Sequence, residues 1–160
     1  MPTTVRRSPG RLLVPGLLVV LAGCVGAPTP PEDPAVLEPC PERPSCVVSR
    51  PDAGDATVDP LPGAGAPLAS HRLLLAVLRA LPEARITADD GRHVTTVFRS
   101  PVLRLRDDVR FAIRDDGTID VRSVSRVGWW DLGANRRRVE TLRDLLAAKL
   151  ASGMPPGVGP

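Results

Sequence analysis

Three consecutive arginines at positions 136–138 follow Asn135 at the start of a predicted C-terminal helix. A guanidinium group can bind carboxylate or phosphate through two parallel hydrogen bonds. We expect Asn135 to cap this helix, whose N-terminal end already carries partial positive charge. Three arginines in the first turn are therefore unfavourable unless an anion compensates them. That anion is either internal, from Asp131, Glu140 or the Asp107–Asp108 pair, or an external ligand.

We predict that the loop–helix junction from Ser125 to Arg138 binds an anionic group without catalysing a reaction. Trp129 or Trp130 would form an apolar or sugar-stacking wall beside the anion. A lipid headgroup, a polysaccharide acid or a protein carboxylate would fit such a site. The anion contacts would be Arg126, Arg137 and Arg138, and the full set of candidate ligand-binding residues is Arg122, Ser123, Ser125, Arg126, Asp131, Asn135, Arg137 and Arg138.

Two other interpretations of this junction stay open. In the first, the arginines belong to an internal salt-bridge network that ties the loop to the sheet. In the second, the protein is a structural or assembly factor that docks another envelope protein, and Trp129 and Trp130 are exposed together as a patch.

A hydrolase is the least favoured interpretation, and we assign no catalytic residue. Ser123 and Ser125 have no histidine in their segment and no G-x-S-x-G turn. Asp107 and Asp108 are adjacent in a predicted strand, so their side chains point to opposite faces. His71 and His93 are isolated, and we predict neither a metal site nor a cofactor.

The N-terminus resembles a lipoprotein signal peptide over residues 1–23. Three arginines precede an apolar run over 12–21, which is too short to span a membrane. The sequence Leu-Ala-Gly then leads to Cys24 and resembles a lipobox. We therefore predict lipidation of Cys24 by a diacylglyceryl group, palmitate among its acyl chains, with export to the periplasmic or exterior side of the envelope. Val25 in place of Asp favours the outer membrane where the host has one.

Charge argues against a nucleic-acid partner. The chain has 21 basic and 18 acidic residues. The predicted signal peptide removes three arginines, which leaves 18 of each and a formal net charge of zero. Export would also separate the chain from nucleic acid. The membrane, reached through the lipid on Cys24, and an anionic ligand or envelope protein are the partners that we expect.

Cys40 and Cys46 allow one intramolecular pairing, and an exported compartment is oxidising enough for a disulfide. We favour this disulfide over a metal site, which would lack further ligands nearby. Eleven prolines lie in residues 28–67, so we assign residues 24–67 to an acidic, extended tether containing the Cys40–Cys46 loop. That loop is expected to pack against the domain, which we place at residues 68–150, before a loose tail over residues 151–160.

The domain pattern predicts a small, single α+β domain. A helix over Ser70–Leu81 precedes about four antiparallel strands, and a second helix follows them. Alternation of apolar and polar residues marks the strands, and Asp-Gly pairs mark two of the turns. With helices flanking the sheet, the strands are expected at residues 84–89, 92–99, 108–114 and 119–123, and the second helix at 136–150.

The motif S-x-S-R-x-G-x-x-D-x-G-x-N-x-x-R, starting at Ser123, resembles the family known as domain of unknown function 1499. An upstream C-P-x-x-P-x-C-V and the Asp107–Asp108 pair resemble the same family, in the same order. The resemblance covers roughly residues 40–150 and implies no established reaction, substrate or cofactor. Ser45 and the Trp129–Trp130 pair depart from the family pattern.

Overall fold

The computed structural model describes residues 37–100 and 103–153. The predicted signal peptide and Cys24 lie outside these residues. The elements in chain order are β1 (Cys46–Val48), a 3-10 turn η1 (Gly54–Ala56), α1 (Pro67–Ala80), β2 (Ala84–Asp89), β3 (His93–Arg99), β4 (Arg106–Ile113), β5 (Ile119–Ser125) and α2 (Ala134–Ala151).

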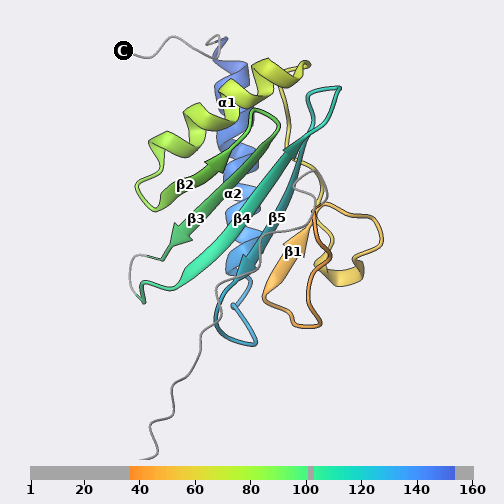
Figure 1. The fold of residues 1–160 in the computed structure, drawn as a ribbon, viewed down its shortest axis with the longest axis vertical. Helices are drawn as coiled ribbons and strands as arrows, with labels where there is room; N and C mark the ends of the chain where they lie inside the picture. The colour runs from red at the N-terminus through yellow and green to blue at the C-terminus, as the bar shows by residue number, and fades with distance from the viewer. Residues whose placement is uncertain (1–36, 101–102, 154–160) are drawn as a thin grey trace, which may run out of the picture.

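The five strands form one antiparallel sheet in the order β1-β5-β4-β3-β2 (Figure 1). Alternate residues are buried in β3 and over most of β4, as the sequence pattern predicts for strands covered on one face, whereas residues 121–125 of β5 are all buried. Val94, Phe111 and Val121 pack in one cluster with Leu74 of α1 and Leu142 of α2. Both helices therefore cover the same face of the sheet, and the predicted α+β class is confirmed.

Residues 37–66 form part of the domain, which corrects the extended tether that proline content predicted for them. Val47 and Leu61 are buried in the core, and β1 adds a fifth strand along the edge of β5. Leu61 also exchanges backbone hydrogen bonds with Ile119. Val58 and Leu61 stand singly near prolines, so they form no periodic pattern in the sequence, yet both are buried. The Cys40–Cys46 loop packs against the domain, as expected.

Both helices begin differently from the prediction. α1 starts at Pro67, a residue that suits the first helical turn, and Ser70 lies inside the helix rather than at its cap. The Ser70 hydroxyl instead accepts a hydrogen bond from the backbone N–H of Ala64. α2 starts at Ala134 after Gly133, so Asn135 is not the N-cap residue. Among the described residues, no helix is long and apolar enough to cross a membrane.

Candidate functional site

The junction between β5 and α2 is organised by the carboxylate of Asp131. This carboxylate accepts hydrogen bonds from the backbone N–H groups of Gly133, at 2.9 Å, and Asn135, at 2.7 Å. It thus supplies the negative charge and the acceptors that a helix N-terminus needs. Gly133 has a φ of 78°, which lets the chain turn sharply into the helix. Burial opposes ionisation, but the hydrogen bonds outweigh it and lower the pKa of Asp131.

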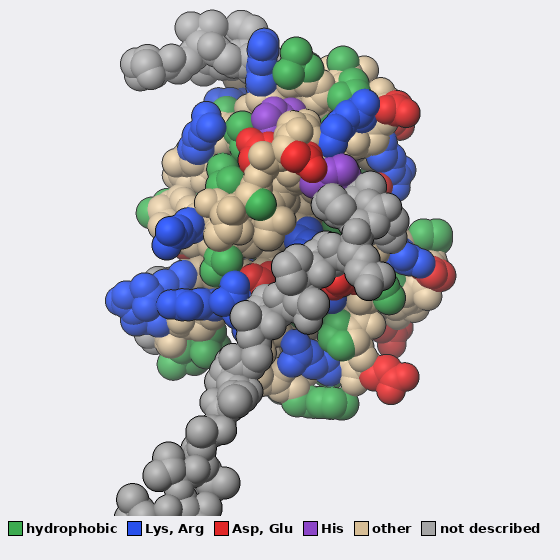
Figure 2. Space-filling model, viewed as in Figure 1, with side chains coloured by type: hydrophobic (Ala, Val, Ile, Leu, Met, Phe, Trp, Pro, Cys, Tyr) green, Lys and Arg blue, Asp and Glu red, His purple; other side chains and the backbone are tan. Residues whose placement is uncertain are grey.

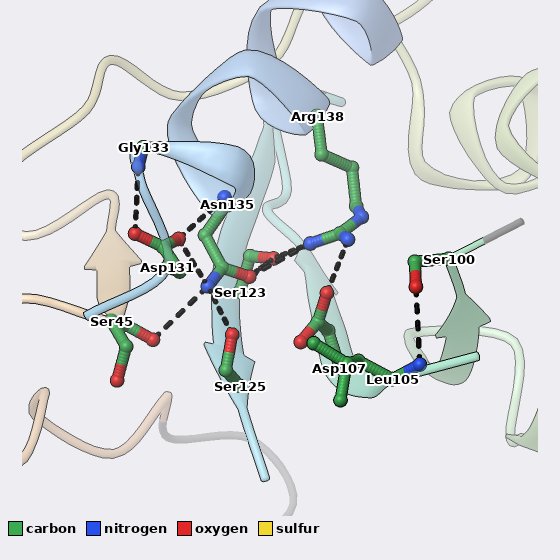
Figure 3. Close-up of polar contacts among 10 residues, drawn as sticks. All are labelled: Ser45, Ser100, Leu105, Asp107, Ser123, Ser125, Asp131, Gly133, Asn135 and Arg138. Atoms are coloured by element: carbon green, nitrogen blue, oxygen red, sulfur yellow. Dashed lines mark hydrogen bonds and ion pairs between the residues drawn. The ribbon is translucent and has the colours of Figure 1, made fainter. Parts of the chain in front are cut away.

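Asn135 is completely buried and joins four parts of the chain (Figure 3). Its Nδ2 donates to the backbone oxygen of Ser45, to Ser125 Oγ and to Asp131 Oδ2. Its Oδ1 accepts from Ser123 Oγ at 2.6 Å. The side chain therefore connects the disulfide loop, two positions on β5 and the Asp131 cap, and its role is structural.

Arg138 extends the same network toward β4. One terminal nitrogen donates to Asn135 Oδ1 at 2.7 Å and to Ser123 Oγ at 3.0 Å, while the other pairs with the Asp107 carboxylate (Figure 3). The guanidinium carbon lies 5.0 Å from the centre of the Phe98 ring, within range for a cation–π contact. Because Asp107 and Arg138 are both largely buried, this ion pair belongs to the interior.

The other arginines of the predicted site separate from this network. Arg126 pairs with both carboxylate oxygens of Asp108, which lies on the opposite face of the sheet from Asp107. Arg136 donates to the backbone oxygens of Thr57 and Asp55. The interpretation as an internal salt-bridge network therefore fits Arg126 and Arg138. Arg136 instead binds uncharged backbone oxygens.

Arg122 lies on the face of the sheet away from the helices. It stands opposite Arg110 on β4, and both guanidinium groups approach Glu38. Burial lowers the pKa of Arg122, as do neighbouring Arg110 and Arg43, while Glu38 opposes this effect. Arg122 is thus separated by the sheet from Arg138 and does not share a site with it.

Ser123 and Ser125 are not placed as nucleophiles. Their side chains face α2 from β5, are almost completely buried, and hydrogen-bond to Asn135. Asp107 is linked to Ser123 through the guanidinium group of Arg138. This arrangement fixes the hydroxyl groups inside the protein and away from any substrate.

The Cys40–Cys46 disulfide is formed, as predicted. The loop that it closes contacts the junction between β5 and α2. Arg43 donates to the backbone oxygen of Ser125 at 2.6 Å and to that of Gly128 at 3.4 Å, and Ser45 Oγ also donates to Gly128. Arg43 and Ser45 were not predicted as parts of the site, because they lie about eighty residues from their acceptors in the sequence.

A pocket of about 590 Å³ opens beside Arg138, between the start of α2, the α1–β2 turn and the end of β3. Its apolar walls include Leu81, Phe98 and Leu142. Among the described residues that line it, the charged side chains are Arg99, Arg104, Arg137 and Arg138, with Glu83 as the single carboxylate. Arg137 and Arg138 were predicted from the motif, but Arg99 at the end of β3 and Arg104 in the β3–β4 connection were not.

The β3–β4 connection holds Arg104 at the pocket. Ser100 and Leu105 close the connection: the Leu105 N–H donates to Ser100 Oγ at 3.1 Å, and the Ser100 N–H donates to the Leu105 oxygen at 2.9 Å (Figure 3). Figure 2 shows Lys and Arg side chains gathered at the edge of the molecule where this connection lies. Within the described ranges, Arg99, Arg104 and Arg137 form no ion pair.

In residues 37–100 and 103–153, no three His, Cys, Asp or Glu side chains are grouped to hold a metal ion. A family model described as a protein of unknown function, DUF1499, matches residues 36–146, well over half of the chain. No curated protein and no solved structure matches the chain significantly. The match includes residues 37–66, which agrees with their place in the folded domain.

Proposed function

The chain belongs to the DUF1499 family, and we propose that it is a lipid-anchored envelope protein whose domain binds an anionic amphiphile. The binding site is the pocket between α2, the α1–β2 turn and the β3–β4 connection. The observation that carries the proposal is the lining of this pocket, in which arginines surround an apolar floor.

The positive charge of the pocket favours an anionic ligand. Arg138 is committed to Asp107, but Arg99, Arg104 and Arg137 have no carboxylate partner among the described residues. The Arg137 guanidinium makes one hydrogen bond, to the backbone oxygen of Leu132, and so retains free donors. Several guanidinium groups with unused donors suit a carboxylate or phosphate.

The apolar floor of the pocket favours a ligand that has an apolar part. Phe98 and Leu142 are almost completely buried beneath it, and Leu81 and Ala134 form its sides. A volume of about 590 Å³ falls within the range of small-ligand sites. A small inorganic anion would leave the apolar walls hydrated, whereas an alkyl chain attached to a carboxylate or phosphate would cover them.

The envelope location rests on the N-terminal sequence. The lipobox-like sequence ends at Cys24, thirteen residues before Leu37, where the described domain begins. Thirteen extended residues reach about 45 Å, so a domain anchored at Cys24 could still approach the membrane surface. The Cys40–Cys46 disulfide also suits an oxidising compartment.

The test is a thermal unfolding series followed by circular dichroism. Decanoate and decyl phosphate, used as monomers, should raise the melting temperature more than decanol or inorganic phosphate. Comparing the two amphiphiles distinguishes a carboxylate ligand from a phosphate ligand. Arg104→Gln with Arg137→Gln should abolish the difference, while Arg72→Gln, at an exposed position on α1 outside the pocket, should preserve it. Equal shifts with decanol and decanoate would contradict the proposal.

A second candidate is the assembly factor, which the exposure of Trp129 and Trp130 favours. In that case, detergent-solubilised envelopes should yield a stable complex that Trp129→Ser with Trp130→Ser disrupts. The pocket variants should leave such a complex intact, which separates the two functions.

A further inference from the structure

Two connections at one end of the sheet expose large apolar side chains. Trp129 is 70% exposed, Trp130 65% and Leu132 64% in the loop between β5 and α2, and Leu103 is 73% exposed in the β3–β4 connection. The β5–α2 loop starts beside the end of the β3–β4 connection, because the Arg126 N–H donates to the backbone oxygen of Arg106. Both lie at the same end of the molecule in Figure 1. We call the exposed side chains at this end the apolar tip: Leu103, Leu105, Val127, Trp129, Trp130 and Leu132.

The loop that carries the tryptophans is held firmly from its inner side. The backbone oxygen of Gly128 accepts hydrogen bonds from Arg43 and Ser45, and Asp131 binds two backbone N–H groups at the start of α2. These contacts fix the backbone on both sides of the two tryptophans. The indole rings nevertheless point away from the protein, so the surrounding structure holds them at the surface.

Positive charge surrounds the apolar tip. Arg99, Arg104 and Arg106 flank Leu103 and Leu105 on one connection, and Arg137 follows Leu132 on the other. The carboxylates within these two stretches, Asp107, Asp108 and Asp131, are already engaged by Arg138, Arg126 and the start of α2. The surface therefore combines exposed indole and leucine side chains with guanidinium groups that form no ion pair within the described part of the chain.

We propose that the apolar tip docks on a lipid bilayer that contains anionic lipids. Tryptophan side chains favour the boundary between headgroups and acyl chains, where the ring is apolar and its N–H is hydrated. Arginines next to them attract a negatively charged surface. This charge complementarity points to a bilayer as the occupant. The proposal goes beyond the ligand pocket and holds whether or not the pocket binds a small molecule.

The only two tryptophans of the chain lie in the apolar tip, so intrinsic fluorescence reports directly on docking. The full chain is mixed with vesicles of equal parts phosphatidylcholine and phosphatidylglycerol, some carrying bromine on the acyl chains near the headgroup. Docking should shift the tryptophan emission to shorter wavelength and quench it with brominated lipid. Vesicles of phosphatidylcholine alone should give a smaller effect. This local measurement does not depend on what else holds the chain to the vesicle.

A reporter at the far end of the molecule is the matched control. Leu68 is 62% exposed at the start of α1, where residues 65, 66 and 70 pack against the Gly117 turn, at the opposite end of β5 from the apolar tip. A variant with Trp129→Phe, Trp130→Phe and Leu68→Trp keeps the tip apolar but moves the reporter. Its emission should stay unquenched.

Removing apolar area should weaken docking while leaving one reporter. Trp130→Ser with Leu132→Ser should lower the quenching of Trp129 by half or more, and Leu68→Ser should leave it unchanged. Quenching of the Leu68→Trp reporter equal to that of the native tryptophans would overturn the proposal. A blue shift that follows protein concentration without vesicles would assign the tip to a second copy of the chain. An unshifted, unquenched emission with either vesicle would also overturn the proposal and leave the tip to a protein partner.

Discussion

The Asp131 carboxylate accepts two hydrogen bonds from Asn135, one from its backbone N–H and one from its side-chain Nδ2, each 2.7 Å long. This double contact joins the loop that carries the tryptophans to the first turn of α2. Through Asn135, the same contact reaches β5 and the disulfide loop. The motif residues Asp131 and Asn135 therefore have a structural role. They fix the loop that carries the exposed tryptophans.

Asn135→Ala should lower the free energy of unfolding by about 3 kcal/mol, because it leaves several buried polar groups without partners. Urea unfolding followed by circular dichroism measures the loss. Asp144→Asn on the exposed side of the same helix is the control and should change stability by less than about 0.5 kcal/mol. A loss for Asn135→Ala no larger than that of the control would show that the network contributes little.

Asp131 should make stability depend on pH at the acidic end. Its pKa is lowered in the folded protein, so the unfolded chain binds a proton at a higher pH than the folded chain does. The resulting stabilisation is complete above the ordinary aspartate pKa of about 4 and is lost as pH falls through the lower folded value. In a urea series, the stability difference between the protein and Asp131→Asn should shrink below about pH 4. A constant difference from neutral pH to pH 3 would refute this explanation.

The two adjacent aspartates should differ in what their ion pairs contribute. The Asp107 and Arg138 side chains are 6% and 14% exposed, against 14% and 32% for Asp108 and Arg126. Removing one partner of a buried pair leaves an uncompensated charge, so Asp107→Asn should cost about 3–5 kcal/mol. Asp108→Asn should cost about 1 kcal/mol or less. Double-mutant cycles with Arg138→Gln and Arg126→Gln measure the two coupling energies, and equal couplings would contradict the difference in burial.

Much of the sheet was predictable because its pattern is local. Alternation in β4 and β5 and the Asp116–Gly117 turn indicate a hairpin without reference to the rest of the chain. β1 was not predictable in this way, since three residues are too few to show a period and their partners lie more than seventy positions away.

The candidate site was predictable in its residues but not in its geometry. The motif brought Ser123, Asn135 and Arg138 to attention, and the structure places them together. The motif alone does not show that Arg122 and Arg126 face away from these residues, because the strand register and the turn after β5 determine their direction. The pocket arginines Arg99 and Arg104 carry no motif, and only the fold brings them near Arg137.

The Cys40–Cys46 disulfide should stabilise the domain by about 2 kcal/mol, the entropy expected for closing so short a loop. Cys40→Ser with Cys46→Ser should lower the unfolding free energy by this amount. Because Arg43 and Ser45 hold the backbone oxygen of Gly128 from this loop, amide hydrogens near Gly128 should also exchange with solvent faster in the variant. Hydrogen exchange unchanged over residues 126–133 would show that the loop keeps its place without the bond.

Gly63 should tolerate no side chain, which tests whether residues 37–66 belong to the domain. A Cβ at Gly63 would lie 1.6 Å from the backbone oxygen of Gly117, so Gly63→Ala must displace the β4–β5 turn. The expected loss of stability is about 3 kcal/mol or more, since neither backbone segment can yield as a flexible side chain would.

Gly91→Ala is the matched control for this substitution. Gly91 has a φ of 89° but open space around its Cβ position, so alanine there meets backbone strain alone, about 1–2 kcal/mol. Urea unfolding of both variants separates close packing from strain. If residues 37–66 were a tether in solution, Gly63→Ala would leave stability unchanged while Gly91→Ala lowered it, and the contact between Gly63 and Gly117 would then contribute nothing to the fold.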